Sequence, residues 1–203
     1  MKIRTVLCNA AILLLLGTNT ASASSDEAAC EALEQALASA TSISLNAKPF
    51  LAHTDELPSH CRVRGRVEGK VGFELRLPLQ AEWNGKFLLA GCGGFCGQLL
   101  PDKPGSNSIN EALKQGYAAM AHDSGHQSPS TADTNWARGG DDRAVALWAA
   151  EVLPTLVAAS DTIISLYYER AAQRRYFSGC SNGGRLGLVA AQRYPGLFDG
   201  IAA

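Results

Sequence analysis

The sequence lacks an excess of charge of either sign. Its 203 residues include 18 Lys or Arg and 19 Asp or Glu, so the formal net charge is -1. Nucleic-acid binding depends on clustered positive charge, which this balance does not supply, and we therefore expect no nucleic-acid partner. Internal repeats, linkers and low-complexity stretches are also missing. Hydrophobic residues make up 46% of the chain, an ordinary share for a globular domain.

The sequence also lacks an apolar run typical of a membrane span. The run from Val6 to Gly17 follows the positively charged Lys2 and Arg4 and precedes a small-residue cleavage site, Ala21-Ser22-Ala23. It is too short for a stable transmembrane helix and has no stop-transfer flank, and the arrangement is that of a secretory signal peptide. We expect residues 1–23 to be removed, and residues 24–203 to be secreted or periplasmic with no membrane span.

Cysteine is scarce, and the loss of Cys8 with the signal peptide leaves an odd number: Cys30, Cys61, Cys92, Cys96 and Cys180. In an oxidising compartment, one of five lacks an internal partner. A Cys30–Cys61 bridge would join an expected helix over 26–40 to the start of a strand. Cys92 and Cys96 flank Gly-Gly-Phe and could close a small ring, which leaves Cys180 unpaired. No C-x-x-C pair or spaced His accompanies them, so we expect no metal site.

The motif that carries chemistry is Gly-x-Ser-x-Gly at Gly179, Ser181 and Gly183. A serine on a sharp turn between strand and helix is lifted clear of the sheet, and the two glycines let strand and helix approach closely. The next backbone N–H, that of Asn182, points with the positive end of the helix to where an oxyanion would form. We expect Ser181 to be a catalytic nucleophile and Asn182 to donate to the oxyanion.

The elements expected around this motif form an α/β fold. Period-2 patterns and apolar runs predict strands, and a 3.6-residue pattern predicts helices. Pro154 is expected to kink or split the long helix. A leading antiparallel hairpin followed by alternating strands and helices is the start of an α/β-hydrolase. The expected strands are 62–67, 71–77, 86–90, 117–121, 175–178 and one beginning near 199, and the expected helices are 109–115, 144–170 and 184–194.

A glycine-rich loop, residues 91–97, follows a buried strand about ninety residues before Ser181. α/β-Hydrolases place the second half of the oxyanion hole at this point, and glycine lets a backbone N–H approach the developing charge. Gly94 is the first candidate donor and Gly93 the second. The alternative, a tight turn held by a Cys92–Cys96 bridge, is compatible with this role.

Other polar residues are expected to have structural roles. In His122-Asp123-Ser124-Gly125-His126, neighbouring side chains point in opposing directions and cannot form a relay, so the group is interpreted as a polar strand end near the site. We expect Asp199 to serve a turn rather than a triad. The expected surface residues are His53 and His60, the expected core or interface residues are Trp83, Trp136 and Trp148, and the expected helix start is Asp141 to Arg143.

Several of these segments resemble the tannase and feruloyl esterase family, which includes the mono(2-hydroxyethyl) terephthalate hydrolases. The resemblance extends from about Cys30 to Ala203. It is weakest over 144–165, where Pro154 stands in the expected helix. It rests on Trp83-Asn84-Gly85-Lys86-Phe87, the cysteine-bearing glycine loop, Asp123-Ser124-Gly125-His126, Gly179-Cys180-Ser181-Asn182-Gly183-Gly184-Arg185, Ala191-Gln192-Arg193-Tyr194-Pro195 and Phe198-Asp199-Gly200-Ile201-Ala202.

The resemblance implies a secreted serine carboxylesterase that hydrolyses esters of aromatic acids, such as gallates and hydroxycinnamates, through an acyl-enzyme on Ser181. It implies that Cys180 pairs with a cysteine beside the catalytic His. That His, the catalytic Asp and a lid domain that often holds calcium come later in such proteins. No cofactor is expected within these residues. The fold is therefore expected to be the N-terminal part of an α/β-hydrolase, ending after about the sixth strand.

Three hypotheses remain at this point. The first is an incomplete and almost inactive portion of a secreted aromatic-ester hydrolase. The second is a naturally short, non-catalytic product or pseudo-enzyme of the same fold. The third is another serine hydrolase, such as a polyester depolymerase or a peptidase, for which the Cys180-Ser181 pair would not be predicted.

Overall fold

The computed structural model describes residues 20–39, 42–46, 49–103 and 108–203, with side chains from Ser25 onward. The predicted signal peptide falls mainly on residues 1–19, which lie outside the described residues, so it stays a prediction. Helix α1 (Thr20–Ala38) begins six residues before its predicted start and runs across the predicted cleavage site at Ala23.

The described chain forms one mixed sheet in the order β1-β3-β4-β6-β5-β7-β8, with β2 paired to β3. The pairs on the β1 side of β6 are antiparallel, and the pairs from β6 to β8 are parallel. The strands are β1 (Ile43–Leu45), β2 (Phe50–Thr54), β3 (Leu57–Val67), β4 (Val71–Pro78), β5 (Lys86–Ala90), β6 (Ala118–His122), β7 (Arg174–Ser178) and β8 (Gly200–Ala202).

The six predicted strands correspond to β3 through β8. The predicted hairpin is confirmed, since β3 and β4 pair antiparallel with Val67 opposite Val71. The sequence did not predict β1 and β2, because three- and five-residue strands with mostly accessible side chains carry little periodic signal. The predicted α/β class is confirmed.

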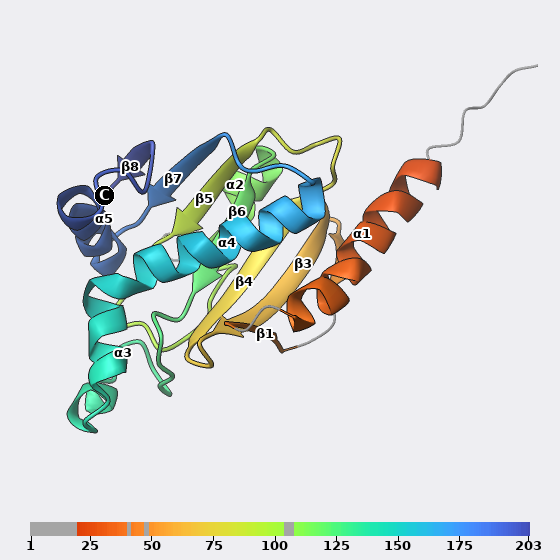
Figure 1. Ribbon diagram of the computed structural model, residues 1–203. Helices are drawn as coiled ribbons and strands as arrows, with labels where there is room; N and C mark the ends of the chain where they lie inside the picture. Colours follow the sequence, from red (N-terminus) through yellow and green to blue (C-terminus); the bar gives the residue numbers. More distant parts are fainter. Residues whose placement is uncertain (1–19, 40–41, 47–48, 104–107) are drawn as a thin grey trace, which may run out of the picture.

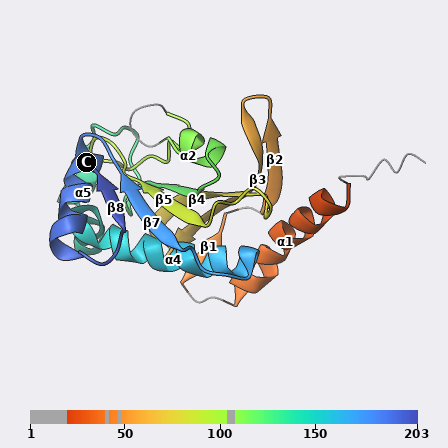
Figure 2. The same cartoon turned by 90° about the horizontal axis from the view of Figure 1, so that it is seen from above.

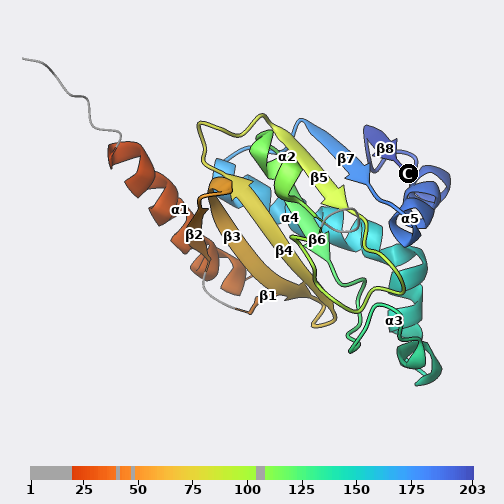
Figure 3. The same ribbon diagram turned by 180° about the vertical axis from the view of Figure 1, so that it is seen from behind.

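Helices cover both faces of this sheet. Figure 1 shows α4 (Val152–Tyr168) across one face with α1 beside it, and Figure 3 shows α2 (Asn110–Lys114) on the opposite face. Figure 2, seen from above, places the sheet between α4 and α2. The remaining helices are the 3-10 turn η1 (Asn135–Arg138), α3 (Asp142–Ala146), the π-helical turn η2 (Leu147–Glu151) and α5 (Asn182–Arg193).

The predicted effect of Pro154 is confirmed in a specific form. The helix continues from Asp142 to Tyr168, but one π-helical turn, η2, comes just before the proline. A proline has no N–H and its ring crowds the carbonyl four residues earlier, so a wider turn ahead of it relieves the clash. At the start of α3, Asp141 accepts a hydrogen bond from Ala144 N–H, as expected for an acidic helix start.

The two disulfides expected within the chain are both present. Cys30–Cys61 joins α1 to β3, and Cys92–Cys96 closes a ring in the glycine-rich loop. Trp83 is buried and stacks on Tyr168, which fits its expected core role.

One expected position is wrong: His60 is buried, with 2% of its surface exposed, and its Nδ1 lies 2.8 Å from the Pro58 carbonyl. The predicted strand began at residue 62, whereas β3 begins at Leu57, so His60 lies inside the strand and is paired with β2 on one side and β4 on the other. His53 is exposed, as expected.

The helical segment Asp142–Tyr168 has 27 residues and is apolar enough to cross a membrane by length and composition. Half of its most apolar window is buried inside the fold, and core helices of soluble proteins meet the same criteria. The expected absence of a membrane span stays a prediction.

Candidate active site

The turn between β7 and α5 places Ser181 in an unusual backbone conformation. Ser181 is the residue before the helix, is exposed, and has φ 57° and ψ -118°, a region that side-chain-bearing residues rarely adopt. A Cβ on Gly179 would lie 2.5 Å from the Gly183 carbonyl carbon, and a Cβ on Gly183 would lie 2.8 Å from the Gly91 carbonyl oxygen. The glycines are therefore needed for the close approach that the motif predicts.

The glycine-rich loop faces this turn. Gly91 N–H donates to the Ser178 carbonyl at 2.8 Å, which joins the ends of the neighbouring strands β5 and β7. Ser181, Gly93 and Gly94 line one cavity of about 170 Å³. Gly94 has a φ of +59°, and a Cβ there would lie 2.4 Å from the Thr131 carbonyl oxygen. Glycine at this position therefore allows both the backbone conformation and the close approach of a distant loop.

Three backbone donors are available around this cavity. Within the described residues, the N–H groups of Gly93, Gly94 and Asn182 donate to no protein acceptor. By contrast, Cys96 N–H donates to the Gly93 carbonyl, and Phe95 N–H donates to the Thr131 carbonyl at 2.7 Å. The N–H groups of Phe95 and Cys96 thus stabilise the loop, while those of the candidate oxyanion donors stay available for a hydrogen bond.

The rest of the cavity wall comes from segments that the sequence did not single out. Gln98, Leu100, Lys103 and Thr131 line it. Arg76 on β4 holds the segment before Lys103, because its Nη2 donates to Asp102 Oδ1 at 2.8 Å and it also pairs with the buried Glu74. No local motif marks these residues, since only the folded chain brings 98–103 and Thr131 to Ser181.

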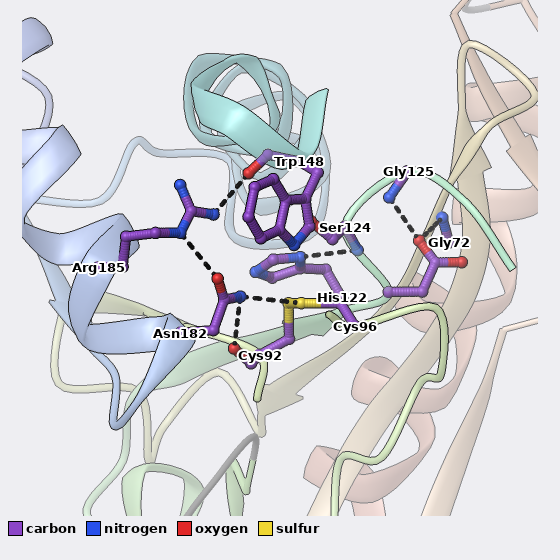
Figure 4. Close-up of a disulfide and its surroundings, with 10 residues drawn as sticks. Gly72, Cys92, Cys96, His122, Ser124, Gly125, Trp148, Asn182 and Arg185 are labelled. Carbon is purple, nitrogen blue, oxygen red and sulfur yellow. Dashed lines mark hydrogen bonds between the residues drawn. A yellow bond between two sulfur atoms is a disulfide. The ribbon is translucent and has the colours of Figure 1, made fainter. Parts of the chain in front are cut away.

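The Asn182 side chain joins the turn to the disulfide ring. Its Nδ2 donates to the Cys92 carbonyl at 3.1 Å and lies 3.2 Å from Cys96 Sγ (Figure 4). The first residue of α5 is thereby fastened to the loop that carries Gly93 and Gly94. The disulfide ring is therefore linked directly to the start of the helix that follows Ser181.

The polar group at the end of β6 is buried and holds backbone together. His122 Nδ1 accepts from Ser124 N–H at 3.1 Å, and Asp123 Oδ1 accepts from the N–H groups of Gly72 and Gly125, each at 2.9 Å. Figure 4 shows His122 beside the Cys92–Cys96 ring. Within the described residues, the Ser181 side chain makes no capping hydrogen bond at the start of α5. The interpretation as a polar strand end near the site is confirmed.

Burial shifts the acid–base behaviour of this group. Desolvation lowers the pKa of His122 to about 4 and raises the pKa of Asp123 to about 6. His126 stacks on Trp136 with ring centroids 3.7 Å apart, and burial lowers its pKa as well. Neutral imidazoles are therefore expected at both positions near pH 7.

Asp199 lies at the opposite end of β7 from the nucleophile. Its Oδ2 accepts from Arg175 N–H at 2.8 Å and its Oδ1 from Arg174 Nη1 at 2.9 Å, at the start of the strand whose far end leads to Ser181. These hydrogen bonds, first that from the Arg175 backbone, lower the pKa of the carboxyl. The expected turn role is confirmed.

Cys180 is an exposed free thiol in the described structure. It lines a second cavity of about 510 Å³ together with Ser178, Gly179 and residues of α2, and Ser181 is not part of this cavity. Across the described residues, no group of three or more His, Cys, Asp or Glu side chains is arranged to hold a metal ion.

Proteins of known name with similar sequences are esterases and ester hydrolases. A family model described as tannase and feruloyl esterase matches residues 56–203. An uncharacterized esterase of Xanthomonas campestris is 37% identical over 94% of this chain and 34% of its own length. The mono(2-hydroxyethyl) terephthalate hydrolase of Piscinibacter sakaiensis is 34% identical over 78% of this chain and 28% of its own length.

The crystal structure of feruloyl esterase B from Aspergillus oryzae superposes with a TM-score of 0.70 at 23% identity, covering 87% of this chain and 36% of that one. This likeness confirms the α/β-hydrolase class of the fold. The chain spans about a third of the length of the relatives it matches.

Proposed function

Because this chain belongs to the tannase and feruloyl esterase family, a family of carboxylic ester hydrolases, we propose that it carries the nucleophile half of a serine esterase site. The observation that carries the proposal is the position of Ser181. It sits on a strained turn at the start of α5 and shares a small cavity with Gly93 and Gly94. This geometry is what attack on an ester carbonyl and capture of the oxyanion require.

In the proposed reaction, Ser181 Oγ bonds to the ester carbonyl carbon as its proton passes to a general base. The carbonyl oxygen becomes an oxyanion that accepts hydrogen bonds from the N–H groups of Asn182 and Gly94, with Gly93 as the second candidate in the loop. Collapse of the tetrahedral intermediate expels the alcohol, which takes up the proton, and leaves an acyl-enzyme on Ser181. Water then hydrolyses the acyl-enzyme by the same sequence of steps.

We propose that the base is a histidine, oriented by an aspartate, in a part of the natural protein outside these 203 residues. Support comes from two described histidines, which are buried and engaged elsewhere: His122 Nδ1 accepts from Ser124 N–H, and His126 stacks on Trp136. The exposed thiol of Cys180 would pair with a cysteine beside that histidine. Calcium, if the full protein binds it, would be held in its lid domain.

The proposed substrates are esters of aromatic acids of the gallate or hydroxycinnamate type. The relatives support this class by their names, which include feruloyl esterases and a terephthalate monoester hydrolase. We propose that the protein is exported to an oxidising compartment. The predicted signal peptide and the two disulfides support this location. N-terminal sequencing of the exported protein should begin at Ser24.

The test measures hydrolysis of methyl gallate and methyl ferulate by the natural protein at full length and by the 203-residue chain. We expect the full-length protein to hydrolyse at least one ester and the Ser181→Ala variant to lose activity by about 10³-fold or more, since triad members act as a unit. The 203-residue chain should show no turnover above that of its own Ser181→Ala variant. Turnover by the short chain that Ser181→Ala abolishes would contradict the assignment of the base.

A further inference from the structure

Arg185 connects the nucleophile turn to the neighbouring π-helical turn η2. Its Nε donates to Asn182 Oδ1 at 2.8 Å, one helical turn earlier in α5. Its Nη2 donates to the Trp148 carbonyl at 2.7 Å (Figure 4), and its Nη1 donates to the Ala149 carbonyl at 3.0 Å. The guanidinium carbon also lies 4.0 Å from the centre of the Trp148 ring. Three of its nitrogens are therefore fixed by acceptors from two helices.

These contacts determine how the Asn182 amide is turned. A guanidinium can only donate hydrogen bonds, so the Asn182 oxygen must face Arg185. The amide nitrogen must then face the other way, where the Cys92 carbonyl and Cys96 Sγ accept from it. A continuous chain of donors and acceptors runs from Arg185 through Asn182 to the Cys92–Cys96 ring, and each member fixes the orientation of the next.

The carbonyls that Arg185 binds belong to the π-helical turn η2. Pro154 has no N–H, so in the i to i−5 hydrogen-bond pattern of the π-helical turn the Ala149 carbonyl lacks the donor that another residue at 154 would supply. Arg185 Nη1 supplies a donor to the Ala149 carbonyl. The proline that interrupts the helix pattern thus exposes an acceptor to which α5 is attached.

Charge neutralisation does not explain this arrangement. Within the described residues, Arg185 forms no ion pair with a carboxylate, although it is partly buried. Its partners are an amide oxygen, two backbone carbonyls and an indole ring. A partly buried guanidinium satisfied only by neutral acceptors holds geometry, because each of its donors has a fixed direction.

We propose that Arg185 is a positioning residue for the oxyanion hole: it fixes the Asn182 side chain between the π-helical turn and the Cys92–Cys96 ring, and so keeps the Asn182 and Gly94 amides directed at one point. This inference rests on the proposed function for its catalytic consequence. The mechanical part is that Arg185, through Asn182, keeps the Cys92–Cys96 ring packed against α5. This part depends only on the contacts described above.

The mechanical part is tested on the 203-residue chain by the rate at which a phosphine reduces each disulfide, followed by alkylation and peptide mass spectrometry. In Arg185→Met, we expect Cys92–Cys96 to be reduced about tenfold faster, because local opening exposes a ring that is otherwise buried. Cys30–Cys61 serves as an internal reference and should keep its rate. The matched control is Arg193→Met, an exposed arginine at the end of the same helix, which should change neither rate.

A second variant, Asn182→Asp, keeps the bond to Arg185 but loses the donor to Cys92, and should also accelerate reduction of Cys92–Cys96. An unchanged rate for this ring in both variants would overturn the proposal. So would equal acceleration of both disulfides, which would mean that the whole fold had loosened.

The catalytic part is tested in the full-length natural protein with methyl ferulate. Arg185→Met should lower kcat about 100-fold while KM changes by less than about threefold, since the lost alignment acts in the transition state. Arg185→Lys should retain part of the activity, and added ethylguanidinium should partly restore Arg185→Ala. A kcat for Arg185→Met that stays within about twofold of the parent would contradict the positioning role.

These results separate the two proposals. If Ser181→Ala keeps full activity, the proposed function fails, and the disulfide reduction rates still decide whether Arg185 holds the ring. If Ser181→Ala is inactive and Arg185→Met reduces neither kcat nor the protection of Cys92–Cys96, the Arg185 proposal alone fails.

Discussion

At the scale of single residues, the neighbours His122 and Asp123 have opposite effects on stability. Burial lowers the pKa of His122 from 6.5 to about 4, so the unfolded chain takes up its proton first as the pH falls. The stability that neutral His122 contributes is fully present above pH 6.5 and is lost as the pH falls toward 4. Linkage gives about 3 kcal/mol for a shift of this size.

Asp123 acts in the other direction over nearly the same range. Burial raises its pKa from 3.8 to about 6, so the folded protein takes up this proton first. Its contribution is fully present below pH 3.8 and is lost as the pH rises through 6, again about 3 kcal/mol. The two contributions oppose each other between about pH 4 and 6, and the pair should add little net pH dependence.

Single substitutions should separate the two opposing effects of pH on the free energy of unfolding. In His122→Asn, whose amide oxygen can still accept from Ser124 N–H, the free energy of unfolding should rise as the pH falls from 6 to 4. In Asp123→Asn, which keeps an acceptor for Gly72 and Gly125, it should fall from pH 6.5 to 4. Urea unfolding at several pH values measures both slopes. Parallel pH profiles for the two variants would contradict the opposing assignment, and the double variant should be nearly flat.

At the scale of elements, the strand–turn–helix unit depends on two adjacent glycines in different ways. A Cβ on Gly183 would meet the Gly91 carbonyl oxygen at 2.8 Å and its carbonyl carbon at 3.0 Å, both backbone atoms that cannot rotate away. A Cβ on Gly184 would find its nearest neighbour at 3.5 Å, an ordinary contact. The two positions lie on the same helix and provide a matched pair.

We expect Gly183→Ala to destabilise the fold by about 1–3 kcal/mol, the range for overpacking. Gly184→Ala should be neutral or stabilising by up to about 1 kcal/mol, because alanine favours helix over glycine. Urea unfolding of the 203-residue chain measures both changes. Equal effects would show that helix propensity, and not the approach of α5 to Gly91, decides the cost.

The elements that the sequence predicted well carry strong local signals. Apolar runs predicted β5 and β6, and the glycine-flanked serine predicted the turn into α5. The π-helical turn could not be predicted in its form, since Pro154 indicates only an interruption. Arg185 follows Asn182 by three residues, a spacing that places both on one helix face. Its acceptors on η2 could not be predicted, because only the folded chain brings η2 next to α5.

At the scale of the whole molecule, the sequence predicted the mixed α/β sheet and both internal disulfides. The sequence did not predict features whose position depends on segments that are distant along the chain. His60 is buried because β3 begins earlier than predicted and places it between β2 and β4, and β1 and β2 form because the long strand β3 pairs with them. The cavity at Ser181 is lined by residues of three segments: Cys92–Gly94, 98–103 and Thr131. No local sequence pattern links these segments.

The central claim is that Ser181 is the residue that attacks the substrate. The direct measurement is reaction of the full-length natural protein with a fluorophosphonate, whose fluoride a nucleophilic serine displaces, followed by tryptic peptide mapping. The account predicts one adduct, on Ser181 in the peptide Tyr176–Arg185, and none in Ser181→Ala. An adduct on Ser124 or Ser178, or one that persists in Ser181→Ala, would contradict it.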